Sequence, residues 1–235
     1  MENCTSKLYL IPNKISSNDI SNVIPGFISN LVLGIKFYIV ENIREARRYL
    51  KLLNKEIRID ELCFYELNKH TPESEIPGFL NECLNGNDIG LISDAGLPCI
   101  ADPGNVIVML AHQKGIKVVP LVGPSSIFMA LMASGLNGQN FAFNGYLPIE
   151  NKERQNKLKI LEQRSRNEKQ SQIFMDTPYR NNKMLEDIIS TLSPDIYLCI
   201  AANITGDGEF IRTKLVSEWK KEKIDLNKQP CIFII

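Results

Sequence analysis

Short apolar segments alternate with longer helical patterns in the first half of the chain, and this alternation constrains the fold more than any other feature. Strands are predicted over residues 7–11, 36–40, 62–65, 88–92 and 117–121. Helices are predicted between them, over residues 43–53, 73–84 and 102–114. Because strands and helices follow one another in this order, the sequence predicts an α/β fold whose sheet is mostly parallel and covered on both faces.

The pattern changes in the second half of the chain, which predicts a mixed sheet. Helices are predicted over residues 125–133 and 150–163, and strands over residues 141–144, 172–176, 196–201, 209–213 and 231–235. Pro120, Gly123 and Pro124 interrupt both periods between the halves. We therefore expect an N-terminal α/β domain over residues 1–121 and a C-terminal α/β domain over residues 122–235.

Two loops carry the residues best suited to bind a ligand. The first, residues 91–104, follows a predicted strand, and Asp102 is expected to cap a helix whose first turn holds Pro103. Open α/β sheets bind ligands at the carboxyl ends of their strands, where this loop lies. The second loop, residues 123–126, opens a helix whose free N–H groups can meet a carboxylate or a ring nitrogen. For Asp94 the alternative is bracing of its own turn, and for Ser125 and Ser126 it is capping.

Several motifs in this order resemble the tetrapyrrole methylase superfamily. The first is Ser93-Asp94-Ala95-Gly96 with Pro98, Ile100, Asp102, Pro103 and Gly104. The others lie at residues 118–126, 130–136, 143–148 and 176–180. Within the superfamily, the chain most resembles the ribosomal RNA small subunit methyltransferase I group, over roughly residues 7–235. That resemblance implies a two-domain tetrapyrrole methylase-like fold with a cofactor cleft between the domains.

The resemblance also implies an activity and a set of site residues. The expected activity is methyl transfer from S-adenosylmethionine to a ribose 2′-hydroxyl of small-subunit ribosomal RNA. The expected cofactor-binding residues are Ser93, Asp94, Ala95, Gly96, Pro98, Ile100, Pro124, Ser125, Ser126, Ala133, Thr177 and Pro178. The catalytic residue is not identified by the sequence. Glu41 is a candidate through its place in the family pattern, and its alternative role is that of a carboxylate at a helix start. Tyr146 and Arg180 are equally open between facing the cleft and a structural role.

Departures from the family pattern keep two other functions open. Residues 12–20 lack the glycine and the Asn-Leu pair of the family, and residues 201–209 lack its basic residue. Because both cofactor loops are retained, we expect donor binding with an altered acceptor. The alternatives are a methyltransferase acting on a small, tetrapyrrole-like molecule and a catalytically silent S-adenosylmethionine-binding module.

Composition limits the partners. The chain has 27 basic and 27 acidic residues, so no strong overall field attracts a polyanion. The basic segments 44–55 and 152–169 are interpreted as solvated helix faces, with an RNA-docking edge as the alternative. His70 and His112 lie far apart and no Cys-x-x-Cys pair is present, so no metal site is expected. Without a signal peptide or an apolar span, the sequence predicts a cytoplasmic protein with no membrane partner, and the resemblance implies a homodimer.

Overall fold

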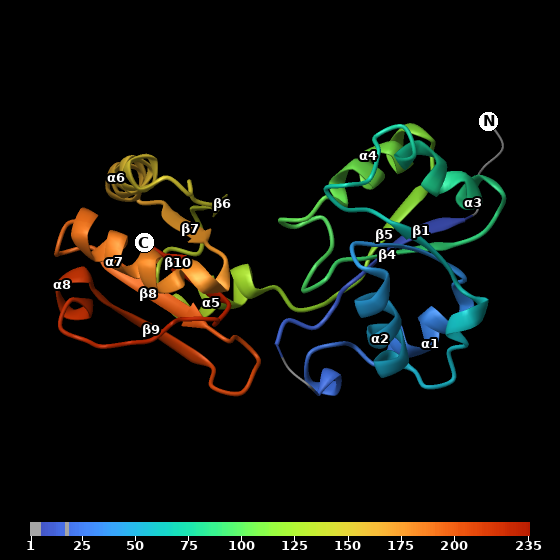
Figure 1. The fold of residues 1–235 in the computed structure, drawn as a ribbon, viewed down its shortest axis with the longest axis horizontal. Helices are drawn as coiled ribbons and strands as arrows, with labels where there is room; N and C mark the ends of the chain where they lie inside the picture. Colours follow the sequence, from blue (N-terminus) through green and yellow to red (C-terminus); the bar gives the residue numbers. More distant parts are fainter. Residues whose placement is uncertain (1–5, 17–18) are drawn as a thin grey trace. The chain divides into compact units, whose positions relative to one another are not determined.

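The computed structural model describes residues 6–16 and 19–235, which form two compact units (Figure 1). The first unit is Met1–Ser125 and the second is Ser126–Ile235. Each unit contains its own five-stranded sheet and its own buried clusters, so each is described by itself.

The sheet of the first unit is entirely parallel. Its strands are β1 (Lys7–Ile11), β2 (Phe37–Val40), β3 (Cys63–Glu66), β4 (Ile89–Ile92) and β5 (Lys117–Pro120). They lie in the order β3-β2-β4-β1-β5, and all four neighbouring pairs are parallel. The predicted α/β fold with a parallel first sheet is confirmed. All five carboxyl ends therefore lie at the same edge, and this edge holds the candidate site.

Helices cover both faces of this sheet. On one face, α1 (Phe27–Leu31) and α2 (Ile43–Leu53) pack through Ile28 and Leu50 against side chains such as Tyr38. On the other, α3 (Asn81–Leu84) and α4 (Asn105–Gln113) pack around Leu8 and Ile107. Figure 1 shows these two pairs of helices on opposite sides of the strands. Short 3-10 helices complete the unit: η1 (Ile20–Asn22), η2 (Val32–Gly34), η3 (Ile59–Glu61) and η4 (Ile76–Leu80).

One predicted helix of the first unit differs from the structure. The segment 73–84 is not a single α-helix, because η4 occupies Ile76–Leu80 and α3 only Asn81–Leu84. Pro77 and Gly78 account for the difference. Proline has no backbone N–H to donate and glycine weakens a helix interior, so the segment forms the tighter 3-10 turn first.

The sheet of the second unit is mixed, as predicted. Its strands are β6 (Phe141–Tyr146), β7 (Ser171–Met175), β8 (Tyr197–Ala202), β9 (Phe210–Leu215) and β10 (Cys231–Ile234). Their order is β6-β7-β10-β8-β9; β6 and β7 are parallel, and the other three pairs are antiparallel.

Successive residues of β10 pack against helices on opposite faces of this second sheet. Ile232 and Ile234 join the cluster of α5 (Ser126–Ser134), while Phe233 joins the cluster of the other helices. Those helices are α6 (Asn151–Glu168), α7 (Asn181–Thr191) and α8 (Val216–Trp219), and η5 (Pro178–Arg180) precedes α7. No helix in the described part of the chain is both long enough and apolar enough to cross a bilayer.

Candidate functional site

Asn13 links the loops that follow β1 and β4, which are neighbouring strands of the parallel sheet. Its backbone N–H donates to the Gly96 carbonyl at 2.8 Å. Its side-chain amide donates to the carbonyls of Ser93 at 2.9 Å and Asp94 at 3.1 Å. Asn13 is only 5% exposed, so these bonds are shielded from water. Asn13 belongs to residues 12–20, one of the segments that depart from the family pattern, and it holds the loop after β4 in place.

The loop after β5 joins the same cluster at two glycines. A Cβ placed on Gly123 would lie 2.1 Å from Pro12 Cβ, so only glycine permits this approach. A Cβ on Gly96 would lie 3.5 Å from the Pro124 carbonyl oxygen, and the Gly96 backbone is left-handed, with φ of 68°. The predicted site residues Gly96 and Pro124, from two different loops, are thus close neighbours.

Carboxylates collect at this edge of the sheet. Glu41 follows β2, and its Oε1 accepts the backbone N–H of Asp94 at 3.0 Å. Burial raises the pKa of Glu41, and the neighbouring charges of Asp94 and Asp102 raise it further against that hydrogen bond. Burial also raises the pKa of Asp94, with Glu45 and Glu66 as additional negative neighbours.

These carboxylates have no cationic partner in the described residues. No ion pair there includes Glu41, Asp94 or Asp102, and the Asp94 side chain accepts no hydrogen bond. The alternative that Asp94 braces its turn through its carboxylate therefore has no bond to support it. Like charges held together raise one another's pKa, and a bound cation relieves that repulsion. The edge fits a cationic ligand.

Asp102 does not cap α4 in the predicted way. The helix begins at Asn105, with Gly104 at its N-cap position, so Pro103 lies outside it. The Asp102 carboxylate instead accepts the N–H of Cys99 through Oδ2 and that of Gly104 through Oδ1, both at 2.7 Å. It closes a tight loop in which Cys99 and Ala101 have left-handed φ values of 70° and 64°. Its role is to hold the shape of the loop.

A small cavity lies behind this loop. Its volume is about 10 Å³, which suits a single water molecule. It is lined in part by Glu41, Ser93, Pro98 and Asp102. Of the other predicted residues in this loop, Ala95 is exposed and Ile100 is 45% exposed. The buried members thus shape the loop, and the exposed members are available to a ligand.

The second unit carries the remaining predicted site residues. Ser126 begins α5 and Ala133 is exposed near its end, while Thr177 and Pro178 lie at the start of η5, one residue beyond β7. Ser125, at the end of the first unit, is 8% exposed. The structure therefore brings together residues 93–98 and 123–124 in one unit, and assigns four predicted residues to the other.

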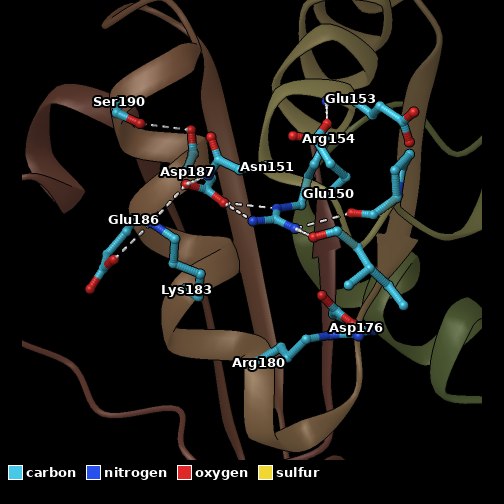
Figure 2. A network of polar contacts seen from close by, with 12 residues as sticks. Glu150, Asn151, Glu153, Arg154, Asp176, Arg180, Lys183, Glu186, Asp187 and Ser190 are labelled. Atoms are coloured by element: carbon cyan, nitrogen blue, oxygen red, sulfur yellow. Dashed lines mark hydrogen bonds and ion pairs between the residues drawn. The ribbon is translucent and has the colours of Figure 1, made fainter.

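A buried polar network fixes the turn after β6, and the sequence analysis did not identify it. Arg154 is 4% exposed and donates to Asp187 Oδ2 at 2.7 Å and to the Ile149 carbonyl at 2.6 Å (Figure 2). Asn151 and Lys183 also contact Asp187 Oδ1, each at 3.1 Å. The desolvation that would raise the pKa of Asp187 is outweighed by these donors, so its pKa is lowered.

The sequence did not decide whether Arg180 and Tyr146 face the cofactor site or have a structural role. Figure 2 shows the Arg180 side chain directed at Asp176, whose Oδ1 accepts from Nε at 2.8 Å. Tyr146, at the end of β6, is 56% exposed. Arg180 therefore has a structural partner. Within residues 6–16 and 19–235, no three His, Cys, Asp or Glu side chains group in a way that could hold a metal ion.

Comparison with known proteins assigns the family. The chain is 32% identical over 237 residues to the ribosomal RNA small subunit methyltransferase I of Buchnera aphidicola subsp. Schizaphis graminum, covering 99% of this chain and 79% of that protein. The chain belongs to the ribosomal RNA small subunit methyltransferase I family. It is 29% identical to the Vibrio cholerae member over 97% of this chain and 76% of that one. Membership makes the protein a methyltransferase, although no family model matches the chain.

Solved structures agree on the fold of this methyltransferase. The methyltransferase CobJ superposes with a TM-score of 0.65 at 12% identity, over 98% of this chain and 93% of that one. A uroporphyrin-III-C-methyltransferase from Thermus thermophilus superposes with a TM-score of 0.54 at 14% identity, over 97% of this chain and 93% of that one. The predicted tetrapyrrole methylase fold is therefore confirmed.

Proposed function

We propose that this methyltransferase transfers a methyl group from S-adenosylmethionine to a ribose 2′-hydroxyl of small-subunit ribosomal RNA. The acceptor rests on the names of the relatives, which match nearly the whole chain. The donor rests on one structural observation above all. Where the loops after β1, β2, β4 and β5 converge, two carboxylates with raised pKa, Glu41 and Asp94, lie without a cationic partner in the described residues.

The donor matches this arrangement group by group. When bound, S-adenosylmethionine supplies a methyl group made electrophilic by a cationic sulfonium. Asp94 and Glu41 offer negative charge to that cation, and the exposed residue Ala95 lies between them and Gly96 with a backbone that can hydrogen-bond a ligand, its carbonyl already accepting the Ser93 hydroxyl at 3.1 Å. The further contacts that the family resemblance assigns belong to the same proposal: Ser93, Gly96, Pro98, Ile100, Pro124, Ser125, Ser126, Ala133, Thr177 and Pro178.

Methyl transfer places two demands on the residues of this chain. The acceptor oxygen and the methyl carbon must be held in line, since alignment supplies much of the acceleration. The hydroxyl proton must also pass to a base as the new C–O bond forms and the C–S bond breaks. Glu41 is our candidate for that base, because its raised pKa lies closer to neutrality than that of an ordinary carboxylate.

We also propose that the protein acts in the cytoplasm as a homodimer. The location follows the expected ribosomal acceptor. The dimer is supported by the family resemblance and by apolar side chains on the surface of α5, where Phe128 is 51% and Met132 is 83% exposed. Sedimentation velocity tests the dimer, and a monomer at micromolar concentration would contradict it.

The acceptor is tested by mapping ribose methylation in small-subunit ribosomal RNA from cells with and without the gene. We expect one or more 2′-O-methyl positions to disappear in the deletion strain and to return on complementation. An unchanged map, together with S-adenosylmethionine binding by calorimetry, would move the assignment to a small-molecule acceptor. Binding without transfer to either acceptor class would indicate a silent donor-binding module.

A further inference from the structure

Helix α2 carries a concentrated positive surface in a protein whose net charge is zero. Its core-facing side chains are Ala46, Tyr49, Leu50 and Leu53. The exposed side chains on the opposite side include Arg44, Arg47, Arg48 and Lys51, which we call the α2 basic face. At 100° per residue these four fall within an arc of about 100°. The cations therefore form one continuous stripe.

Most of this charge is not neutralised locally. Glu45 is the only acidic residue of α2, and it pairs with Arg48 at 2.8 Å. No ion pair within the described residues includes Arg44, Arg47 or Lys51. The Lys51 ammonium donates to the Lys55 carbonyl at 3.1 Å, and that partner carries no negative charge. Three uncompensated cations thus remain for an anionic partner.

An aromatic ring lies beside this stripe. The Arg47 guanidinium lies 5.3 Å from the ring centroid of Phe64, which comes from the neighbouring strand β3. Cations together with an aromatic surface are typical of proteins that bind single-stranded nucleic acid, where charges track the phosphates and rings stack on bases. Phe64 is half-buried and already stacks on Tyr38, with ring centroids 5.8 Å apart, so it fixes the position of the Arg47 guanidinium at the surface.

The stripe also leads to the candidate site. Helix α2 begins at Ile43, two residues after Glu41, and extends away from the edge of the sheet where the carboxylates collect. Its 11 residues span about 16 Å, roughly four or five nucleotide steps of a helical strand. Within one unit, acidic charge lies at the candidate donor site and basic charge on the adjoining helix. This segregation fits a cationic donor and an anionic acceptor.

We propose that the α2 basic face binds the phosphate backbone of the acceptor RNA and guides it to the site at Glu41 and Asp94. This inference rests on the proposed ribosomal RNA acceptor. Helix α6 provides the comparison surface, because its cations are interleaved with Glu153 and Glu168, and Arg166 is already paired with Glu162 and Asp195.

The test compares two triple variants with the same change in charge. The α2 variant carries the substitutions Arg44→Gln, Arg47→Gln and Lys51→Gln. The α6 variant carries Lys152→Gln, Lys157→Gln and Lys159→Gln. Affinity for transcribed small-subunit ribosomal RNA is measured from 50 to 200 mM salt. We expect the α2 variant to bind at least about tenfold more weakly, and its slope of log affinity against log salt to fall by about 2 to 3, near 0.7–0.9 per cation. The α6 variant should match wild type.

Three results separate this proposal from the proposed function. An α2 variant with wild-type RNA affinity and salt slope overturns the docking surface, even if the wild type methylates the RNA. Equal weakening by both variants also overturns it, since net charge alone would then explain binding. A wild-type protein that neither binds nor methylates the RNA overturns the acceptor and the docking surface together. Unchanged affinity of both triple variants for S-adenosylmethionine shows that their folding is intact. A variant with Arg44→Lys and Arg47→Lys, which keeps the positive charges, should bind RNA again.

Discussion

Gly123→Ala tests whether the close approach of the loops after β1 and β5 builds the donor site. The added Cβ would lie 2.1 Å from Pro12 Cβ and 2.5 Å from its Cγ. Carbon atoms pack at about 3.5–4.0 Å, so the loops must separate by about 1.5 Å. Pro12 cannot yield easily, because its ring is rigid and its carbonyl accepts the buried Tyr49 hydroxyl at 2.5 Å.

Two effects of this displacement are expected. Overpacking of this kind costs roughly 1–3 kcal/mol of unfolding free energy, measured by urea denaturation. Misplacement of a site by about 1 Å can reduce turnover about 100-fold, so we expect kcat/KM to fall by that order and the Kd for S-adenosylmethionine to rise at least about tenfold. Calorimetry measures the Kd, and transfer of a labelled methyl group measures turnover.

Two further variants make the Gly123 experiment decisive. Gly34→Ala is the matched control, because a Cβ at Gly34 meets no atom within 4 Å, and we expect it to bind the donor as the wild type does. Pro12→Gly combined with Gly123→Ala removes both contacted ring atoms and should restore part of the affinity. A folded Gly123→Ala protein with wild-type donor affinity would refute the reasoning that this contact shapes the site.

Three further predictions follow from the charges. The affinity for S-adenosylmethionine, measured by calorimetry, should fall about tenfold as pH is lowered through the raised pKa values of Glu41 and Asp94. The affinity for S-adenosylhomocysteine should fall less, because its sulfur is neutral. Parallel pH profiles for the two ligands would contradict this. Asp102→Ala strands two N–H groups, so it should cost about 1–3 kcal/mol and speed hydrogen exchange over residues 99–104, whereas unchanged exchange would exclude its loop-closing role. Asp187→Asn should cost about 3–5 kcal/mol in urea denaturation at pH 7, because it leaves buried Arg154 unpaired, and a loss below 1 kcal/mol would contradict that role. Since the pKa of Asp187 is lowered in the folded protein, its contribution to the unfolding free energy is present above the unfolded pKa of about 3.9 and is lost as pH falls through the folded pKa. The Asp187→Asn variant should lack this dependence of unfolding free energy on pH.

Elements with a clear local period were predictable from the sequence. The structure reproduces the predicted bounds of β1 and α2, because short apolar runs and 3.6-residue spacing are properties of neighbouring residues. Helix α7 was missed although Met184, Leu185 and Ile188 carry the helical spacing. The amphipathic spacing of α7 is therefore present in its sequence.

The contacts that shape the site could not be predicted in the same way. Asn13 bonds to carbonyls 80 and 81 residues away, and Arg154 pairs with a carboxylate 33 residues away. No local period encodes such partners, because they depend on the order of strands in the sheet. The error at Asp102 has the same origin. A carboxylate before proline suits a helix cap, and only the folded loop shows that the N–H of Cys99 competes for it.

A structure of the protein with bound S-adenosylhomocysteine tests the central claim most directly. The account predicts that the ligand contacts the backbone of residues 94–96 and of residues 123–125, with its sulfur near the carboxylates of Glu41 and Asp94. A ligand bound away from the carboxyl edge of the parallel sheet, with these loops untouched, would contradict it.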